Sequence, residues 1–160
     1  MIDELLARNE KYAAAYPGAA PHPPALRLAV IACMDSRLDV HSVLGLAPGD
    51  AHVIRNAGGV ITDDAIRSLV ISQRLLGTRE VALLHHTDCG MAKFTDAGLK
   101  DAIEADAGVR PPWATEAFTD LDQDVRQSVA RVTASPFVPH KDQVRGFVFD
   151  VATGRLREVG

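Results

Sequence analysis

The sequence has few cysteines, few aromatic residues and no long apolar run. Two cysteines among 160 residues are too few for the disulfide framework on which many small secreted domains depend. The longest uninterrupted apolar run, Leu28 to Met34, has seven residues, whereas a membrane-spanning helix needs about 20. These absences exclude a disulfide-rich scaffold and an integral membrane protein.

The chain also lacks an excess of basic residues. Seventeen Lys and Arg residues stand against 21 Asp and Glu, which gives a formal net charge of −4. Nucleic acids and anionic membranes are both recognised by basic surfaces, so neither is predicted as a partner. The first residues, Met1 to Leu5, are acidic where a signal peptide would be basic, which favours a cytoplasmic location.

The composition that remains is that of a globular protein. With 47% hydrophobic and 24% charged residues, the chain is neither disordered nor fibrous. Its length suits one domain with its own core, so we expect a single domain over residues 1–160.

The first 24 residues are predicted to form an arm. Residues 1–16 have the spacing of an amphipathic helix, which Pro17-Gly18 should end. Three further prolines as far as Pro24 favour an extended connector. We expect residues 1–24 to lie on the body of the protein or to reach a partner subunit. The apolar positions of the predicted helix are Ile2, Leu5, Leu6, Ala13 and Tyr16.

Three short apolar segments predict buried strands, at residues 26–33, 51–55 and 81–84. A helix is expected between the second and the third, capped by Thr62 and ending at Gly77. Strands separated by a loop and then by a helix are typical of an α/β protein with a parallel sheet.

The rest of the chain completes the predicted fold. Residues 93–133 are polar and rich in helical pattern, and residues 144–151 and 156–159 indicate a closing strand and a short return. The predicted fold class is therefore α/β: a three-layer single domain with a mostly parallel central β-sheet flanked by helices, preceded by the N-terminal helical arm.

Residues with metal-binding and acid–base chemistry follow two of the predicted strands. Cys33 ends the first strand and is followed by Asp35 and Arg37, while the third strand runs into His85 and ends at His86, which is followed by Cys89. The carboxyl ends of neighbouring parallel strands meet at one crevice. Cys33, His86 and Cys89 should therefore meet.

Two thiolates and one imidazole are a suitable ligand set for zinc, and three protein ligands leave a fourth position open, as in catalytic sites. A single buried cysteine is more often a small apolar core residue. The complete set, with Asp35 and Arg37 in the same loop, favours a metal site instead. We expect one Zn²⁺ per chain.

Three motifs in order resemble the β-class carbonic anhydrases, in particular their short bacterial members: Cys-Met-Asp-Ser-Arg at 33–37, Arg-Asn-Ala-Gly at 55–58 and His-Thr-Asp-Cys-Gly at 86–90. The resemblance implies the reversible hydration of CO₂ to bicarbonate and a proton, the activity of a carbonate dehydratase, which is a lyase. It implies that Cys33, His86 and Cys89 are the zinc ligands.

The resemblance also implies roles for the loop after the first cysteine. Asp35 and Arg37 match the family's catalytic dyad, in which the arginine holds the carboxylate away from the metal and the dyad orients a zinc-bound hydroxide. In some members this aspartate becomes a fourth zinc ligand, in a closed and inactive state, so Asp35 is also a predicted metal ligand. Members with a regulatory bicarbonate site have a tryptophan where this chain has Val30, so we expect no such site.

Family members are dimers or larger assemblies in which an N-terminal helix covers the neighbouring subunit. Residues 1–24 fit that role, so the resemblance implies a homodimer or a higher homo-oligomer. The implied partner is otherwise a small molecule, CO₂ or bicarbonate, with no nucleic acid and no membrane.

Some neighbouring residues have predicted roles of their own. The backbone amides of Gly58 and Gly90 are expected to contact a substrate oxygen, because glycine permits close approach. Asp88, beside a predicted ligand, is expected to support the site from outside the ligand set. Arg55 matches the arginine of the family's regulatory bicarbonate site, and its alternative interpretation is as a structural salt-bridge residue.

Other polar or aromatic residues are interpreted as structural. His85 is expected to face away from His86 and to pack in the core or at an interface. Trp113 is interpreted as a packing anchor, and residues 120–124 as a solvated helix face.

Two alternatives remain open. One is a related hydrolase of small molecules on the same scaffold, for example one acting on carbon disulfide. The other is a module without enzymatic activity, in which Cys33 and Cys89 bind a structural zinc or sense redox state. The Asp35–Arg37 pair favours an enzyme, since a structural zinc site needs no carboxylate beside an open position.

Overall fold

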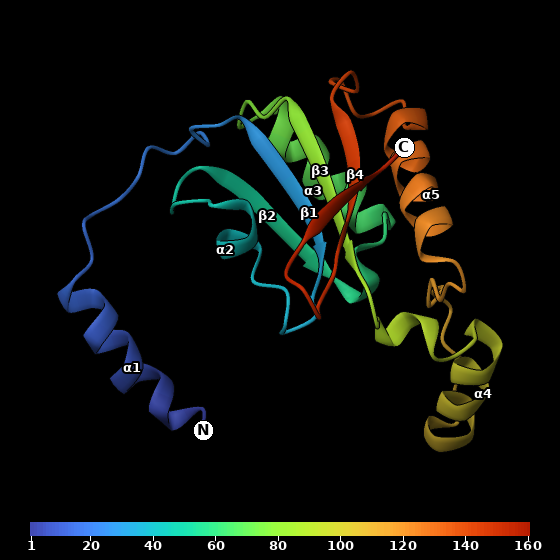
Figure 1. The fold of residues 1–160 in the computed structure, drawn as a ribbon. Helices are drawn as coiled ribbons and strands as arrows, with labels where there is room; N and C mark the ends of the chain where they lie inside the picture. The colour runs from blue at the N-terminus through green and yellow to red at the C-terminus, as the bar shows by residue number, and fades with distance from the viewer.

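A computed structural model describes residues 1–160 and contains one five-stranded sheet, in the order β2-β1-β3-β4-β5 (Figure 1). Four strands run parallel, and β5 pairs antiparallel with β4 at one edge. The strands are β1 (Leu28–Cys33), β2 (Ala51–Asn56), β3 (Glu80–His86), β4 (Val144–Phe149) and β5 (Leu156–Val159).

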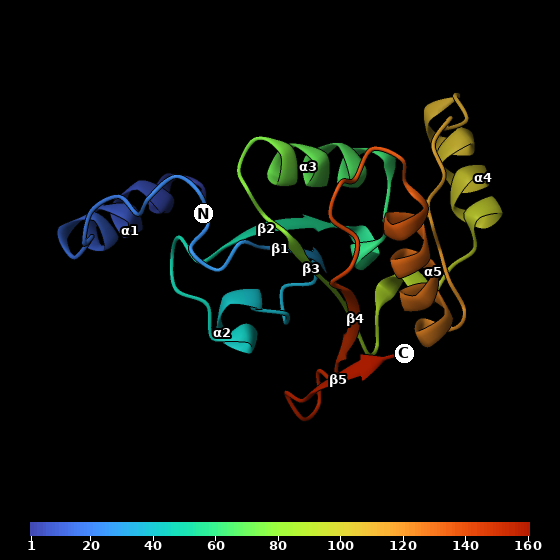
Figure 2. The same cartoon turned by 90° about the horizontal axis from the view of Figure 1, so that it is seen from above.

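Helices cover both faces of this sheet, giving three layers (Figure 2). α3 (Asp63–Arg74) and α5 (Leu121–Ala134) pack on one face, and α2 (Val40–Leu44) lies on the other. α4 (Asp96–Ala107) stands beyond α5 and has no buried residue. The chain is thus a single α/β domain with a mostly parallel sheet, as the sequence predicts.

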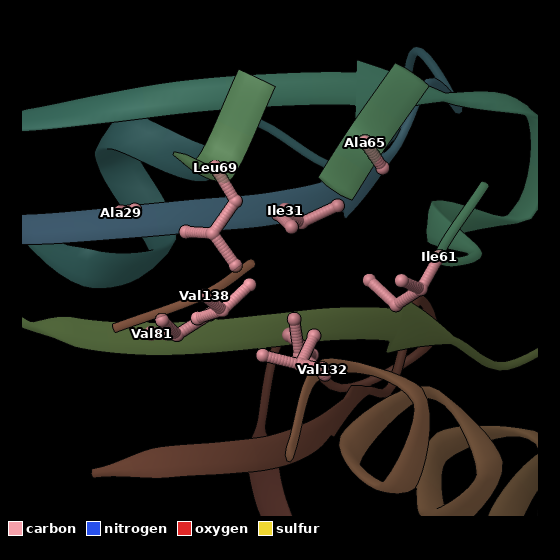
Figure 3. Packing of buried hydrophobic residues seen from close by; sticks show 9 residues of the cluster. Ala29, Ile31, Ile61, Ala65, Leu69, Val81, Val132 and Val138 are labelled. Atoms are coloured by element: carbon pink, nitrogen blue, oxygen red, sulfur yellow. The ribbon is translucent and has the colours of Figure 1, made fainter. Parts of the chain in front are cut away.

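Strand β1 is apolar on both faces, as expected of an interior strand that is covered from both sides. Ile31 packs with Leu69 of α3 and Val132 of α5 on one face, and Figure 3 shows this cluster. On the opposite face Val30 and Ala32 pack in a second cluster with Val40 of α2. The ends of β1 and β3 are therefore held from both sides.

Several predicted boundaries shift for local reasons. β1 begins at Leu28 rather than residue 26, because Arg27 has φ 53° and breaks the extended backbone. β3 begins at Glu80, one residue earlier than predicted, and ends at His86 as predicted. Helix α3 ends at Arg74, before Gly77. The short helix α2 is not predicted from the sequence; the side chain of Asp39 caps it by accepting from the amide of Ser42.

The N-terminal arm extends from the body of the protein. α1 (Asp3–Ala14) is joined to β1 by a long extended connector and stands apart from the sheet (Figure 1). None of its residues is buried, and the apolar Leu6 is 76% exposed. The predicted helix is present, and its apolar face has no cover within the chain. No helix in the structure is both long and apolar enough to cross a membrane.

Candidate metal centre

Three side chains with metal-binding groups meet at the carboxyl ends of β1 and β3. Cys33, His86 and Cys89 each offer one ligand atom, and these atoms all lie within 4.8 Å of one another. All three residues are 5% exposed or less. The sequence predicts this meeting from strand topology, and the structure brings the three residues together as expected.

The sheet and one turn bring the three residues together. β1 and β3 are adjacent and parallel, with Ala32 opposite Leu84, so Cys33 and His86 lie at neighbouring strand ends. Beyond β3 the chain turns sharply at Asp88, whose φ is 53°. Aspartate tolerates this left-handed conformation better than most residues. The turn returns Cys89 towards His86.

Gly59, which is not among the predicted site residues, allows the loop after β2 to pack closely over the ends of β1 and β3. Gly59 has φ 71°, and a Cβ at this position would lie 2.7 Å from the Cys33 nitrogen and 2.9 Å from the Leu84 oxygen. Any side chain here would force the loop away from both strands. In the sequence, only the adjacent glycines Gly58-Gly59 indicate a close approach at this loop. The group that Gly59 approaches is the backbone of β1 and β3 rather than a ligand.

The His86 ring is oriented by the backbone. Its Nδ1 lies 2.8 Å from the carbonyl oxygen of Thr87, and its Nε2 lies 3.2 Å from Cys33 Sγ. Donation from Nδ1 to the carbonyl leaves Nε2 facing the sulfur atoms. Histidine ligands of metals are usually oriented in this way.

The two thiols share their protons unequally. A hydrogen bond from the Cys89 thiol lowers the pKa of Cys33 to about 4, against the effect of burial. The same contact, together with burial, raises the pKa of Cys89. Burial lowers the pKa of His86, but the Cys33 sulfur and the Thr87 carbonyl outweigh burial and the net shift is upward. The proton that the two sulfurs share therefore resides on Cys89 rather than on Cys33.

The donor set fits zinc. Two sulfurs and one imidazole nitrogen are ligands that zinc prefers, and they converge in a buried position as a tetrahedral site requires. Asp35 Oδ2 lies 3.6 Å from His86 Nε2, so a carboxylate stands beside the three donors.

Arg37 holds that carboxylate with paired hydrogen bonds. Its Nε donates to Asp35 Oδ1 at 3.0 Å and its Nη2 to Oδ2 at 2.8 Å, and its backbone amide also donates to Oδ1 at 2.9 Å. These hydrogen bonds hold the pKa of Asp35 well below its usual range. Asp35 is therefore ionised and fixed in orientation at neutral pH.

A second carboxylate also binds Arg37. Nη1 donates to Asp88 Oδ2 at 2.9 Å, and Nη2 donates to the Asp88 carbonyl oxygen at 3.1 Å. Lys93 Nζ lies 2.7 Å from the other oxygen, Oδ1. Lys93 and then Arg37 lower the pKa of Asp88 to about 2.

Arg55 stabilises the loop between Cys33 and Asp35, but in a different way from that predicted. Its guanidinium donates to the carbonyl oxygen of Cys33 at 3.0 and 2.8 Å and to that of Asp35 at 2.7 Å. No carboxylate pairs with it, so the interpretation as a salt-bridge residue is wrong. Arg55 binds backbone carbonyls that would otherwise need other donors.

The two glycines predicted to contact substrate differ in their surroundings. Gly58 is buried with φ 83°, and a Cβ there would lie 3.2 Å from side-chain atoms of Met91 and Val60. Gly90 follows Cys89 directly, is exposed and has open space where a side chain would stand. The substrate contacts of both remain predictions.

The opposite face of β3 holds a different pair. His85 is buried as expected, and its Nε2 lies 3.4 Å from Asp124 Oδ2, with no hydrogen-bond partner for either ring nitrogen. The Asp124 side chain is only 12% exposed, so the interpretation of residues 120–124 as a solvated face is wrong at this position. Trp113 is 55% exposed and does not anchor the core.

Comparison with known proteins identifies the family. Residues 28–156 match the sequence model described as "Carbonic anhydrase". The chain is 58% identical to "Beta-carbonic anhydrase 1" of Mycobacterium tuberculosis over 159 residues, covering 99% of this chain and 98% of that protein. The chain belongs to the β-carbonic anhydrase family.

Two further similarities define its place among β-carbonic anhydrases and their relatives. The solved structure of a carbonic anhydrase from Streptococcus mutans is 45% identical with a TM-score of 0.94, covering 99% of this chain and 97% of that one. A "Carbon disulfide hydrolase" of Saccharolobus solfataricus is 34% identical over 182 residues, covering 98% of this chain and 88% of that protein.

Proposed function

We propose that this protein catalyses the reversible hydration of CO₂ to bicarbonate and a proton. The observation that carries the proposal is an ionised Asp35, held by Arg37, beside three converging donors. A structural metal site would not need this carboxylate. The high identity to a protein named as a β-carbonic anhydrase supports the same activity.

Cys33, His86 and Cys89 are the residues that would hold one zinc ion per chain. When bound, zinc supplies a Lewis acid that makes water a nucleophile near neutral pH.

Asp35 orients the attacking oxygen. Its carboxylate can only accept hydrogen bonds while ionised, and Arg37 keeps it ionised. A hydrogen bond from the nucleophile to Oδ2 directs the oxygen lone pair away from Asp35, towards the carbon of CO₂. Arg37 also restrains Asp35 from turning towards the three donors, where its carboxylate would compete with the nucleophile.

The surroundings suit a nonpolar substrate. Ala57, Met91 and Phe94 pack in the same apolar cluster as Cys33 and Cys89, and they line an adjoining hollow. The amides of Gly58 and Gly90 are proposed to donate to a substrate oxygen as negative charge develops on it.

Carbon disulfide hydrolysis is the second candidate, because one relative carries that name. The identity to that relative is 34%, against 58% to the β-carbonic anhydrase, so CO₂ is the favoured substrate.

Stopped-flow CO₂ hydration, with metal analysis of the same preparation, tests the proposal. We expect about one zinc per chain and a kcat/KM that rises from neutrality towards about pH 8–9, because the two cysteine thiolates would neutralise the charge of the ion and leave it a weaker Lewis acid than three histidines would. Asp35→Asn should retain zinc and lose most of the activity. A plateau complete by about pH 6.5 would contradict the thiolate argument.

The other outcomes separate the alternatives. Release of hydrogen sulfide from carbon disulfide without CO₂ hydration would support the second candidate. Zinc without either activity would indicate a structural site. Absence of zinc together with a reversible Cys33–Cys89 disulfide would indicate a redox module.

We further propose a homodimer in which the arm, residues 1–24, covers the partner. The support is the exposed apolar face of α1, which nothing in its own chain covers. Deleting residues 1–24 should shift the protein towards monomer or aggregate in light-scattering measurements. A truncated protein that stays dimeric and fully active would show that the arm is not the clasp.

A further inference from the structure

The Arg37 guanidinium lies between two carboxylates, and the proposed reaction uses only one of them. One edge of the guanidinium, Nε and Nη2, binds Asp35. Nη1 and Nη2 also donate to the side chain and carbonyl of Asp88. Four hydrogen bonds therefore fix a side chain that is 46% exposed.

Asp88 is itself fixed from two sides. Its backbone has φ 53°, a conformation that is set by the turn between His86 and Cys89. Lys93 Nζ binds Oδ1 at 2.7 Å, which leaves Oδ2 directed at Arg37. A turn that places Cys89 therefore also places a carboxylate and a carbonyl against Arg37.

We propose that Asp88 is a positioning residue, which holds Arg37 in the plane where it pairs with both oxygens of Asp35. This inference rests on the proposed function for its effect on catalysis, although the contact itself does not. Rotation of Arg37 away from Asp35 would break the contacts with Asp88 at the same time. Without the Asp88 charge, Arg37 is less restrained, and Asp35, 3.6 Å from His86 Nε2, is freer to turn towards the three donors.

Asp88→Asn is the appropriate variant. Asparagine has the same shape and also tolerates positive φ, so the turn and the carbonyl contact should remain while the charge is lost. Asp101→Asn is the matched control. Asp101 is an exposed aspartate of α4 that pairs with Arg110, beyond the end of that helix, at 2.6 Å, and it has no contact with the site.

The direct measurement is nitrogen-15 NMR of the arginine side chains in the zinc-loaded protein. Rotation about the Cζ–Nη bonds of a guanidinium slows when both edges are hydrogen-bonded, and Arg37→Lys identifies the Arg37 signal by its loss. We expect Asp88→Asn to speed this rotation at Arg37 and Asp101→Asn to leave it unchanged. In parallel, Asp88→Asn should lower kcat/KM for CO₂ hydration by about two- to fivefold, the range for a partly exposed ion pair.

Each outcome decides the proposal. Faster Arg37 rotation with lower kcat/KM supports it. Unchanged rotation in Asp88→Asn overturns it, whether or not activity falls, because Asp88 would then act by another route. Faster rotation with unchanged kcat/KM overturns the catalytic role. If the wild-type protein hydrates no CO₂, the proposed function fails, and the NMR measurement still decides whether Asp88 holds Arg37.

Discussion

His85 and His86 are adjacent at the end of β3 and are equally buried, each 1% exposed, but they lie on opposite faces of the sheet. His86 faces Cys33, Cys89 and Asp35, and its pKa is raised. His85 faces α5, where its pKa is lowered to about 4, chiefly by burial.

Burial lowers the pKa of both histidines, and only His86 has partners that outweigh this effect. His86 has the Thr87 carbonyl on one ring nitrogen and the Cys33 sulfur near the other. His85 has only Asp124, at 3.4 Å, and that carboxyl has its own pKa raised to about 6 by burial and by Glu116. Two identical residues in one strand thus have opposite chemistry because the two sheet faces supply different neighbours.

Exchanging each histidine for glutamine should separate the two faces most strongly. His86→Gln removes a candidate ligand, so we expect loss of zinc and a fall in CO₂ hydration of at least about a hundredfold, more than changes outside the ligand set usually cause. His85→Gln should keep about one zinc per chain and lose roughly 1–2 kcal/mol of stability. Metal analysis, stopped-flow assays and urea unfolding measure these effects. Equal zinc loss in both variants would show that strand-end geometry, rather than ligation, governs the site.

The pH dependence of zinc affinity should follow the groups on the His86 face. Cys33, with a pKa of about 4, is already a thiolate at pH 7 and contributes no proton. Cys89, with its raised pKa, must release one proton, and protonated His86 must release another at lower pH. Zinc affinity should therefore rise about tenfold per pH unit at pH values above the pKa of His86, where only Cys89 releases a proton. Below that pKa, where His86 releases a second proton, the affinity should rise more steeply.

Competition with a coloured chelator between pH 6 and pH 8 measures this slope. His85→Gln is the control and should give the same slope as the wild type, since His85 is not a candidate ligand. A zinc affinity that does not change with pH would contradict the unequal sharing of protons between Cys33 and Cys89.

Asp124→Asn should give the smallest effect, on the His85 face. The pKa of Asp124 is raised in the folded protein, so the folded state holds a proton that the unfolded chain has lost. This contribution to stability is present at low pH and is lost as pH rises towards about 6. The amide of the variant does not ionise. The free energy of unfolding of Asp124→Asn, relative to that of the wild type, should therefore rise by roughly 1 kcal/mol from pH 5 to pH 8, after allowance for solvent screening. Urea unfolding of both proteins at the two pH values measures this change. A stability difference between variant and wild type that is the same at both pH values would contradict the prediction.

Local patterns in the sequence predicted much of this molecule. The apolar run through Ile31 identifies a doubly buried strand, and Thr62 does cap α3, accepting from the amide of Ala65. Because parallel strands end at a common edge, the meeting of Cys33 with His86 also followed from the order of the elements. These features depend on near neighbours in the chain or on topology, and both can be read from residue order.

Contacts between loops and across helices were decided only by the tertiary structure. Asp88 reaches Arg37 over 51 residues, and Arg55 binds carbonyls rather than a carboxylate. Asp124 is turned inward against His85, although its acidic neighbours suggested a solvated face. Residue order shows which positions are apolar and where strands end. The partner of a polar side chain depends on how separate loops come together, because hydrogen bonds act over a few ångströms and are set by the final packing.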